Sequence, residues 1–354
     1  MEISEIQVDG YEKVVRCRDA ASGLHALIAV HDTTLGPALG GLRMWPYTSE
    51  DEALYDVLRL SRGMTYKSAV GETGLGGGKS VILGDPAKDK SEALFRSMGR
   101  FIDSLGGTYI TAEDMNIGIP DLEIVRQETR WVTGLSRASG SSGNPSPYTA
   151  MGCVHGMRAV LEELYDKDDF TDRHFLIQGV GAVGGRLAQL LHERGARITI
   201  CDINDKRVAE LSDKFGYEVV DDETHLDVEC DVYAPCARGA GINDETLPKL
   251  KCKAVAGCAN NQLAKEKEHA DALRSAGILY APDFVLNAGG IINVSVELFP
   301  GGYDENVAME RIERIYKNMK RLFAISKEED ISSLAAAMRL AQDRLDAAKA
   351  KKRA

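Results

Sequence analysis

The sequence has no long apolar run, no signal-peptide pattern in its first residues and no basic run in its interior. No stretch approaches the roughly 20 apolar residues that a membrane-spanning helix needs. The N-terminus, MEISEIQVDG, has neither the basic start nor the apolar core of a signal peptide. Basic residues cluster in the short tail 349–353, and the net charge is −11. We therefore expect neither nucleic acid nor membrane as a partner, because an acidic protein is repelled by both.

Paired metal or disulfide ligands are also missing from the sequence. The seven cysteines are scattered without a C-x-x-C pair. The seven histidines form no i, i+4 pair and no Cys/His cluster with zinc spacing. This pattern predicts reduced thiols in a cytoplasmic protein and no metal site.

Length and patterning predict an α/β protein of two domains. The chain has 354 residues, 44% of them hydrophobic and 27% charged, which is typical of globular proteins longer than one domain. Ser49 and Glu52 form a possible capping box for a helix over 49–64. The Gly/Ser/Pro-rich stretch 139–149 is the strongest linker signal. From residue 174 onward, short apolar runs alternate with helical patterns, which indicates a parallel sheet with crossover helices.

The strongest cofactor signal lies at residues 173–202. An apolar strand leads into Gly179-Val180-Gly181-Ala182-Val183-Gly184, then into an amphipathic helix and a second strand that ends before Asp202. In this context the first glycine permits a tight turn, the second lets a pyrophosphate approach the helix N-terminus, and the third permits close packing of helix on strand. Asp202 can accept hydrogen bonds from ribose hydroxyls and would repel a 2′-phosphate. The expected cofactor is therefore NAD rather than NADP.

A second glycine-rich stretch, residues 64–86, looks like a phosphate loop but departs from that pattern. Thr73 stands where the first glycine of the loop is required, and the apolar run after Lys79 reads as a strand instead of a helix. A nucleotide-hydrolysing phosphate loop is therefore the weakest hypothesis for this chain. Lys67 and Lys79 fit another chemistry better, because one lysine can bind a carboxylate while a shielded lysine acts as a general base. Asp114, at the end of a predicted strand over 108–114, is a further acid–base candidate.

Eight motifs follow one another along nearly the whole chain: GPALGGLRMWPY (36–47), RGMTYKSA (62–69), GLGGGKSVI (74–82), ITAEDM (110–115), GSSGNPSP (140–147), YAPCARGAGIND (233–244), GCANNQL (257–263) and YAPDFVLNAGGIINV (280–294). Together they resemble the Glu/Leu/Phe/Val amino-acid dehydrogenase superfamily, and most closely its leucine dehydrogenase branch.

The resemblance implies a role for each matched position. Lys67 would bind the α-carboxylate of the substrate, Lys79 would activate water for attack on the imine, and Asp114 would be its partner in proton transfer. The other positions implied to lie near the substrate are Leu39, Gly40, Gly41, Met64, Asn261, Ile291 and Val294. The positions implied to contact the cofactor, besides the glycine loop and Asp202, are Thr149, Ala234, Pro235, Cys236, Ala237 and Asn260.

The implied side-chain pocket is apolar. Leu39 stands where glutamate dehydrogenases of this superfamily have a lysine, so a glutamate side chain would lack a partner and should be rejected. The bulk of Ile291 and Val294 favours leucine, isoleucine and valine over phenylalanine. The resemblance thus implies reversible oxidative deamination of a branched-chain L-amino acid to a 2-oxo acid, ammonia and NADH. Two alternatives stay open, namely a dehydrogenase for phenylalanine or another aromatic amino acid, and a non-catalytic NAD-binding sensor.

The resemblance also implies two domains with a cleft between them, in a homo-oligomer. An α/β domain for substrate binding, catalysis and oligomerisation would comprise 1–148 plus 328–354. A Rossmann domain that binds NAD would comprise 149–327. Three positions depart from the pattern of the leucine enzymes: Leu42 replaces a threonine, Asn116 a glycine, and Arg238 an apolar residue beside the cofactor turn.

Overall fold

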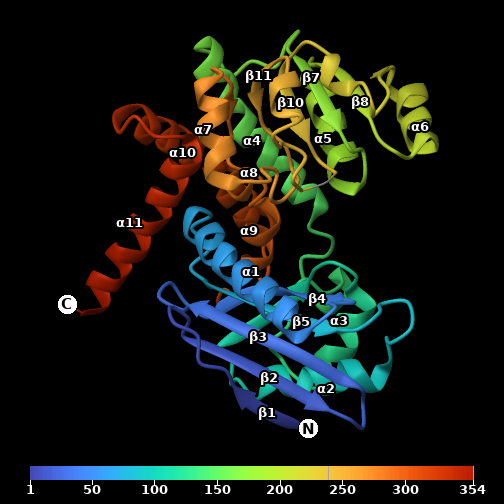
Figure 1. The fold of residues 1–354 in the computed structure, drawn as a ribbon, viewed down its shortest axis with the longest axis vertical. Helices are drawn as coiled ribbons and strands as arrows, with labels where there is room; N and C mark the ends of the chain where they lie inside the picture. The colour runs from blue at the N-terminus through green and yellow to red at the C-terminus, as the bar shows by residue number, and fades with distance from the viewer. Residues whose placement is uncertain (238, 354) are drawn as a thin grey trace. The chain divides into compact units, whose positions relative to one another are not determined.

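The chain folds into two compact units in a computed structural model that describes residues 1–237 and 239–353 (Figure 1). The N-terminal unit comprises Met1–Asn144, Val294–Glu305 and Gln342–Ala354. The Rossmann unit comprises Pro145–Asn293 and Asn306–Ala341. These units differ from the predicted domains at two places near the C-terminus: residues 328–341 belong to the Rossmann unit, and residues 294–305 belong to the N-terminal unit. Helical periodicity shows that a face is buried, but it does not show against which core.

The N-terminal unit is built on a six-stranded mixed sheet with the order β1-β2-β3-β5-β4-β6. Its strands are β1 (Glu2–Glu5), β2 (Lys13–Asp19), β3 (Leu24–Asp32), β4 (Ala38–Trp45), β5 (Gly76–Leu83) and β6 (Tyr109–Glu113). The first four strands in this order pair antiparallel, whereas β4 is parallel to both of its neighbours. The carboxyl ends of β5, β4 and β6 therefore point the same way.

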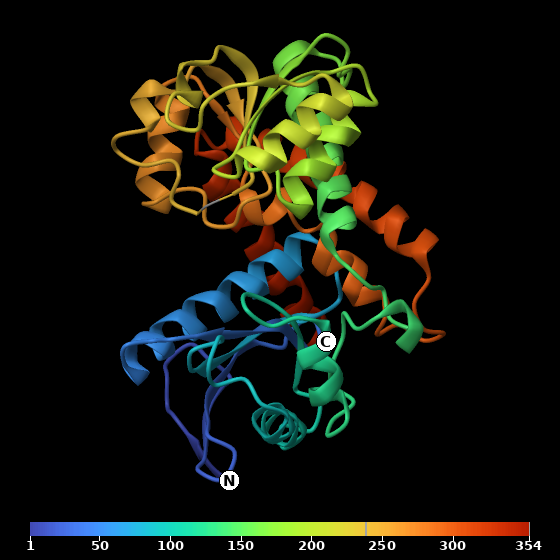
Figure 2. The same ribbon diagram turned by 90° about the vertical axis from the view of Figure 1, so that its right-hand side faces the viewer.

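Helices cover both faces of this sheet. Side chains alternate along β3, so that Leu27 packs with Val57 of α1 (Glu50–Val70), while Ile28 packs with Phe95 of α2 (Glu92–Asp103). A third helix, α3 (Ile119–Arg126), packs on the α2 side. Figure 2 shows α1 and α2 on opposite sides of the sheet.

Helix α1 begins where the sequence predicts but continues six residues further, to Val70. The Ser49 side chain caps the helix by accepting a hydrogen bond from the Glu52 backbone N–H at 3.1 Å. The Glu52 carboxylate reaches the backbone N–H of Thr48 at 2.7 Å, one residue before the partner that a capping box requires. The longer helix includes Lys67.

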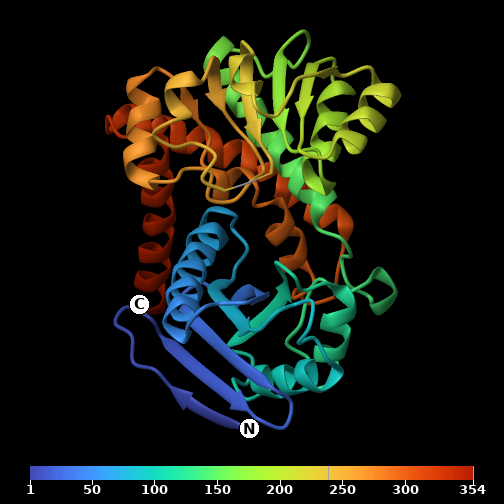
Figure 3. The ribbon, with the colours of Figure 1, turned by 45° about the vertical axis from the view of Figure 1, so that its right-hand side comes forward.

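The Rossmann unit contains a six-stranded, fully parallel sheet with the order β12-β11-β10-β7-β8-β9 (Figure 3). Its strands are β7 (His174–Gln178), β8 (Arg197–Cys201), β9 (Glu218–Val219), β10 (Cys230–Pro235), β11 (Cys252–Val255) and β12 (Leu279–Tyr280). The strand order reverses between β7 and β10, which is where doubly wound sheets bind ligands. The predicted α/β fold with a Rossmann-type second domain is confirmed.

The remaining helices connect these strands or follow them. They are α4 (Ser146–Tyr165), α5 (Ala182–His192), α6 (Asp205–Phe215), α7 (Glu266–Ser275), α8 (Asp283–Leu286), α9 (Gly289–Val296), α10 (Glu305–Glu328) and α11 (Ser333–Arg353), with 3₁₀ turns η1 (Arg137–Ser139), η2 (His225–Asp227) and η3 (Leu247–Lys249). None of the helices in the described part of the chain is long and apolar enough to cross a membrane.

Candidate active site and dinucleotide-binding loop

The two predicted acid–base residues meet in the N-terminal unit. Lys79 lies in the middle of β5, and Asp114 directly follows β6, with β4 between the two strands. The Lys79 Nζ donates a hydrogen bond to Asp114 Oδ2 at 2.6 Å. Only 4% of the lysine surface is exposed, so this ion pair is shielded from bulk water on the lysine side.

A second cation, Arg43, which was not among the predicted site residues, binds the same carboxylate oxygen. Arg43 of β4 donates from Nε to Asp114 Oδ2 at 2.9 Å and from a terminal guanidinium nitrogen to Asp56 Oδ2 at 2.8 Å. The Tyr47 hydroxyl donates to this Asp56 oxygen at 2.7 Å. The sequence did contain one signal: Arg43 lies two positions after Gly41, so both residues point to the same face of a strand.

Burial and neighbouring charges set the protonation of this cluster. Burial lowers the pKa of Lys79, and the Arg43 cation acts in the same direction, while Asp114 opposes both. Burial alone would raise the pKa of Asp114, but the Lys79 and Arg43 cations outweigh it and lower that pKa to about 2. Asp114 therefore stays ionised at neutral pH. When Lys79 releases its proton, Arg43 still balances the carboxylate, so a neutral amine suited to act as a base can exist there.

The glycine-rich stretch around Lys79 is a strand, as predicted, and not a phosphate loop. Lys79 is the fourth residue of β5, which runs from Gly76 to Leu83. The paired glycines of β4 are required by neighbouring protein atoms. A Cβ on Gly40 would lie 1.7 Å from the Gly78 carbonyl oxygen, and a Cβ on Gly41 would lie 2.7 Å from the Asp114 Cβ. The small residues thus allow β4 to pack tightly beside the acid–base pair.

The other predicted substrate positions of this unit lie on β4 and α1. Leu39 is 1% exposed and alternates with Gly41 and Arg43 along β4, so it shares their face of the sheet. Met64 and Lys67 are three residues apart on α1, so they lie on one side of that helix, and both are half-buried. Leu39, Arg43 and the acid–base pair are therefore held by adjacent strands.

The predicted glycine loop leads from β7 into α5 at the point where the strand order reverses. Gly179 has a φ of 94°, and a Cβ there would lie 2.5 Å from the Ala237 Cβ. A Cβ on Gly184 would lie 2.0 Å from the Gly179 carbonyl oxygen. Around Gly181, in contrast, no heavy atom of the described residues other than those of Gly181 and its two chain neighbours lies within 4 Å of the Cβ position. The protein itself leaves space at Gly181, directly before the N-terminus of α5, and this space suits a pyrophosphate.

The predicted acidic residue is attached to this loop. Asp202 follows β8, and its Oδ2 accepts a hydrogen bond from the Val180 backbone N–H at 2.7 Å, while Oδ1 accepts one from Asn204 N–H at 2.9 Å. The turn that follows β10 is held against the end of β7 by Cys236, whose N–H donates to the Gln178 carbonyl at 2.7 Å. The other predicted cofactor positions at these strand ends are Ala182 and Val183, in the first turn of α5, and Ala234, Pro235 and Ala237, at or just after the end of β10.

The remaining predicted positions lie near α4, α8 and α9. Thr149 is in the first turn of α4. Gly290 lies so close to it that a Cβ added to Gly290 would be 2.7 Å from the Thr149 Oγ1. Asn260 accepts a hydrogen bond from the buried Asn287 Nδ2 at 2.7 Å, a residue that the sequence analysis did not name. Asn261 is exposed, and its φ is 52°.

Two predicted pocket residues lie on α9. Ile291 and Val294 are three residues apart, on the same side of this helix, and both are buried. Ile291 belongs to the Rossmann unit and Val294 to the N-terminal unit, because the division between the units falls within α9.

Two of the three departures from the leucine-enzyme pattern have a structural account. Leu42 is fully buried on β4 opposite Ser80 of β5. Asn116 adopts a φ of 64°, a conformation that glycine and asparagine tolerate, and its side chain donates to the Met44 carbonyl at 3.0 Å. Arg238 lies outside the described residues.

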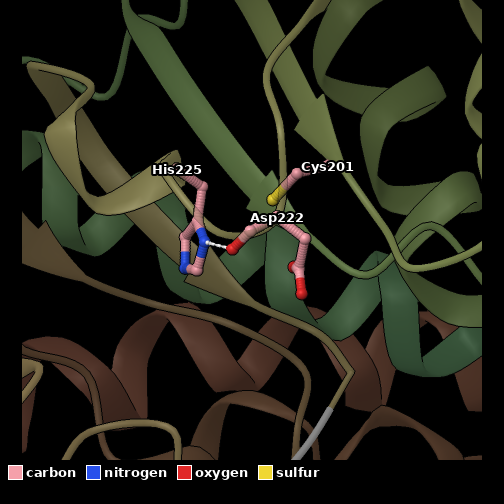
Figure 4. Close-up of side chains that lie close together, drawn as sticks. All are labelled: Cys201, Asp222 and His225. Carbon is pink, nitrogen blue, oxygen red and sulfur yellow. Dashed lines mark hydrogen bonds between the residues drawn. The ribbon is translucent and has the colours of Figure 1, made fainter.

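Three potential metal ligands gather at the carboxyl ends of β8 and β9 (Figure 4). The ligand atoms of Cys201, Asp222 and His225 lie within 4.8 Å of one another. Protein groups already engage them: His225 Nδ1 contacts the Asp222 carbonyl at 2.5 Å, its Nε2 contacts the Tyr233 hydroxyl at 3.2 Å, and Gln178 donates to Asp222 Oδ1 at 3.3 Å. Burial raises the pKa of the Cys201 thiol, which therefore stays protonated at neutral pH. We assign no ion to this group, and the absence of a metal stays a prediction.

Sequence models of one family match most of the chain. The Glu/Leu/Phe/Val dehydrogenase dimerisation domain matches residues 11–134, and the Glutamate/Leucine/Phenylalanine/Valine dehydrogenase domain matches residues 200–353. A leucine dehydrogenase of Geobacillus stearothermophilus is 53% identical over 336 residues, which cover 95% of this chain and 91% of that protein. The chain belongs to the Glu/Leu/Phe/Val dehydrogenase family.

The chain is also similar to two proteins that are named for aromatic amino acids. A phenylalanine dehydrogenase of Bacillus thermotolerans is 44% identical over 342 residues, which cover 95% of this chain and 89% of that protein. The crystal structure of L-tryptophan dehydrogenase from Nostoc punctiforme superposes with a TM-score of 0.86 at 40% identity, covering 96% of this chain and 97% of that one. The predicted membership of the superfamily and the closeness to leucine dehydrogenase are confirmed, and the chain is an amino-acid dehydrogenase.

Proposed function

We propose that this dehydrogenase catalyses the NAD-dependent, reversible oxidative deamination of a branched-chain L-amino acid, with leucine, valine and isoleucine as substrates. The observation that carries the proposal is the buried Lys79, which shares one oxygen of Asp114 with Arg43. This arrangement supplies a base that can be neutral and a carboxylate that stays charged. A non-catalytic sensor would have no use for it.

The residues of the chain divide the work of the reaction. Lys67 holds the α-carboxylate of the substrate. A dinucleotide held at Gly179–Gly184 and Asp202 would supply the acceptor for the hydride of the substrate α-carbon. Lys79 takes a proton from water, so that the resulting hydroxide adds to the iminium carbon, and Asp114 stabilises the ammonium form of Lys79. Lys79 then returns the proton to the leaving nitrogen and takes the proton of the adduct's hydroxyl group, so that the adduct collapses to ammonia and the 2-oxo acid.

Two observations support NAD as the dinucleotide. The space at Gly181 adjoins the N-terminus of α5, where backbone N–H groups attract phosphate oxygens. The Asp202 carboxylate is fixed by backbone N–H groups at 2.7 and 2.9 Å, so it is in place to accept hydrogen bonds from ribose hydroxyls. A 2′-phosphate brought to the same position would meet a fixed negative charge.

Apolar residues support a branched aliphatic substrate. The positions that the resemblance assigns to the substrate side chain are all apolar, and all but the half-buried Met64 are buried within their own units: Leu39, Met64, Ile291 and Val294. A glutamate carboxylate would lose its hydration there without gaining a partner. One observation supports the alternative of an aromatic substrate, namely the similarity of the chain to phenylalanine and tryptophan dehydrogenases. A hydrophobic pocket separates substrates that differ by one methylene group by only about 1–3 kcal/mol, so several aliphatic substrates should be accepted.

The decisive experiment is a screen of the common L-amino acids for NADH formation, repeated with NADP. We expect leucine, isoleucine and valine to give the highest kcat/KM and glutamate to give none. Good turnover of phenylalanine without turnover of the three aliphatic substrates would support the aromatic alternative instead. Binding of NAD without turnover of any amino acid would support a sensor.

We also propose that the protein is a homo-oligomer. The support is the match of residues 11–134 to a dimerisation domain of the family. Light scattering coupled to size-exclusion chromatography should give a mass that is a multiple of 38.5 kDa, and a monomeric mass at micromolar concentration would contradict the proposal.

A further inference from the structure

Two thiols whose sulfur atoms have no part in the proposed reaction lie in contact within the Rossmann unit. Cys153 is in the middle of α4, and Cys258 follows β11 in the loop that leads to Asn260. The Cys258 Sγ lies 3.0 Å from the Cys153 Sγ, and both cysteines are free thiols. Because a disulfide bond is about 2.05 Å long, bond formation needs a movement of only about 1 Å.

The surrounding contacts hold both cysteines in this arrangement. The Cys153 thiol points to the Leu286 carbonyl at 3.6 Å, and the Cys258 carbonyl accepts a hydrogen bond from Asn287 Nδ2 at 3.1 Å. Both segments are thus attached to adjacent residues at the end of α8. The fold has already brought two positions together that are 105 residues apart, so the loss of entropy that opposes a cross-link has occurred on folding.

A third thiol adjoins the pair. Cys236 is half-buried and forms a side-chain hydrogen bond with Cys258. Its backbone is fixed in the turn after β10, where its N–H donates to the Gln178 carbonyl. We choose Cys153 as the partner of Cys258 because their sulfur atoms lie 3.0 Å apart, and the Cys236 pairing is an outcome that the test must distinguish.

We propose that Cys153 and Cys258 form a thiol–disulfide modification site that responds to peroxide. In the first step, the Cys258 sulfur attacks hydrogen peroxide, the O–O bond breaks, and Cys258 sulfenic acid and one water molecule form. In the second step, the Cys153 sulfur attacks the sulfenic sulfur, the S–O bond breaks, and a second water molecule carries away the hydroxyl group and the thiol proton. Two thiols are oxidised and one peroxide is reduced to two waters.

The reaction should be slow but selective. Hydrogen bonding to Cys153 and burial raise the pKa of Cys258 well above its ordinary value, so that little thiolate exists at neutral pH. Cys258 is 8% exposed, and Cys153 is fully buried. Once a sulfenic acid forms at Cys258, the adjacent thiol should capture it before a second peroxide can oxidise it further.

The test is peptide mapping of the folded full-length protein after exposure to hydrogen peroxide. Excess peroxide is removed, the protein is denatured in the presence of N-ethylmaleimide so that the buried thiols are blocked as they become exposed, and the non-reduced digest is analysed by mass spectrometry. We expect a cross-linked pair of peptides that contain Cys153 and Cys258, two hydrogen atoms lighter than the separate peptides and separated by dithiothreitol. Oxidation of Met115, which is 48% exposed, reports that peroxide reached the protein.

Cysteine-to-serine substitutions show which two cysteines form the cross-link. Cys153→Ser and Cys258→Ser should each abolish it, and either variant suffices if the other fails to fold, while the control Cys17→Ser should leave it unchanged. A cross-link between Cys258 and Cys236, or between the register partners Cys230 and Cys252, would overturn the assignment. So would the absence of any cross-link at a peroxide dose that fully converts Met115 to the sulfoxide.

Discussion

Replacing Arg43 by glutamine should move the pH dependence of turnover without removing any group proposed to react. Arg43 and Lys79 donate to the same Asp114 oxygen at 2.9 and 2.6 Å, so the two donor nitrogens are no more than about 5.5 Å apart. At that distance and an effective dielectric constant of about 20, two unit charges repel by about 3 kcal/mol. The Arg43 charge therefore favours the neutral amine of Lys79.

The sign of the effect follows from the role of Lys79 as a base. The neutral amine is the active form, so kcat/KM for leucine oxidation rises as the pH rises through the Lys79 pKa. Removing the Arg43 cation raises this pKa, because the ammonium form is no longer repelled. The acidic limb of the profile should move to higher pH by about 1 to 2 units, less than the full Coulomb value since Asp56 partly neutralises Arg43.

The assay is NADH formation from leucine at saturating NAD over a range of pH. Arg43→Lys, which keeps the charge, should retain a profile near that of the original enzyme. Arg59→Gln is a matched control, because Arg59 contacts the same Asp56 at 3.3 Å but is 41% exposed. An acidic limb that stays in place in Arg43→Gln, or that moves to lower pH, would refute the electrostatic account of Lys79.

Three further predictions concern single residues. Lys79→Ala should abolish turnover while NAD still binds, measured by fluorescence titration, and near-normal activity would contradict the role of Lys79 as base. Asp202→Ser should weaken NAD binding by about 10- to 150-fold, because a hydrogen bond to a charged group contributes about 1.5–3 kcal/mol, and should narrow the preference for NAD over NADP in steady-state kinetics. Gly184→Ala should lower the free energy of unfolding by about 1–3 kcal/mol, because its Cβ would lie 2.0 Å from the Gly179 carbonyl oxygen. Gly181→Ala should leave the free energy of unfolding unchanged and weaken NAD binding, because its Cβ would enter the space proposed for the pyrophosphate. Denaturant unfolding measures the stability of both variants, and NAD titration measures their affinity. Equal destabilisation of Gly184→Ala and Gly181→Ala would contradict the assignment of Gly184 to packing and Gly181 to cofactor binding.

The sequence alone determined the features that depend on contiguous residues. The glycine loop, the strands on either side of it and Asp202 lie within about 30 residues, so spacing and periodicity were sufficient to predict a Rossmann-type fold. The same reasoning showed that Lys79 lies on a strand, since an apolar run and a turn follow it. The N-terminus of α1 was predictable because Ser49 caps its own helix.

Only the tertiary structure decided which distant side chains meet. Lys79, Arg43 and Asp114 converge because β4 lies between β5 and β6, an order that no local pattern encodes. The same holds for the contact between Cys153 and Cys258, which depends on how α4 packs against the loop after β11. Local patterns report how one segment folds, whereas convergence depends on strand order and helix packing, which are fixed by the burial of faces that many segments share.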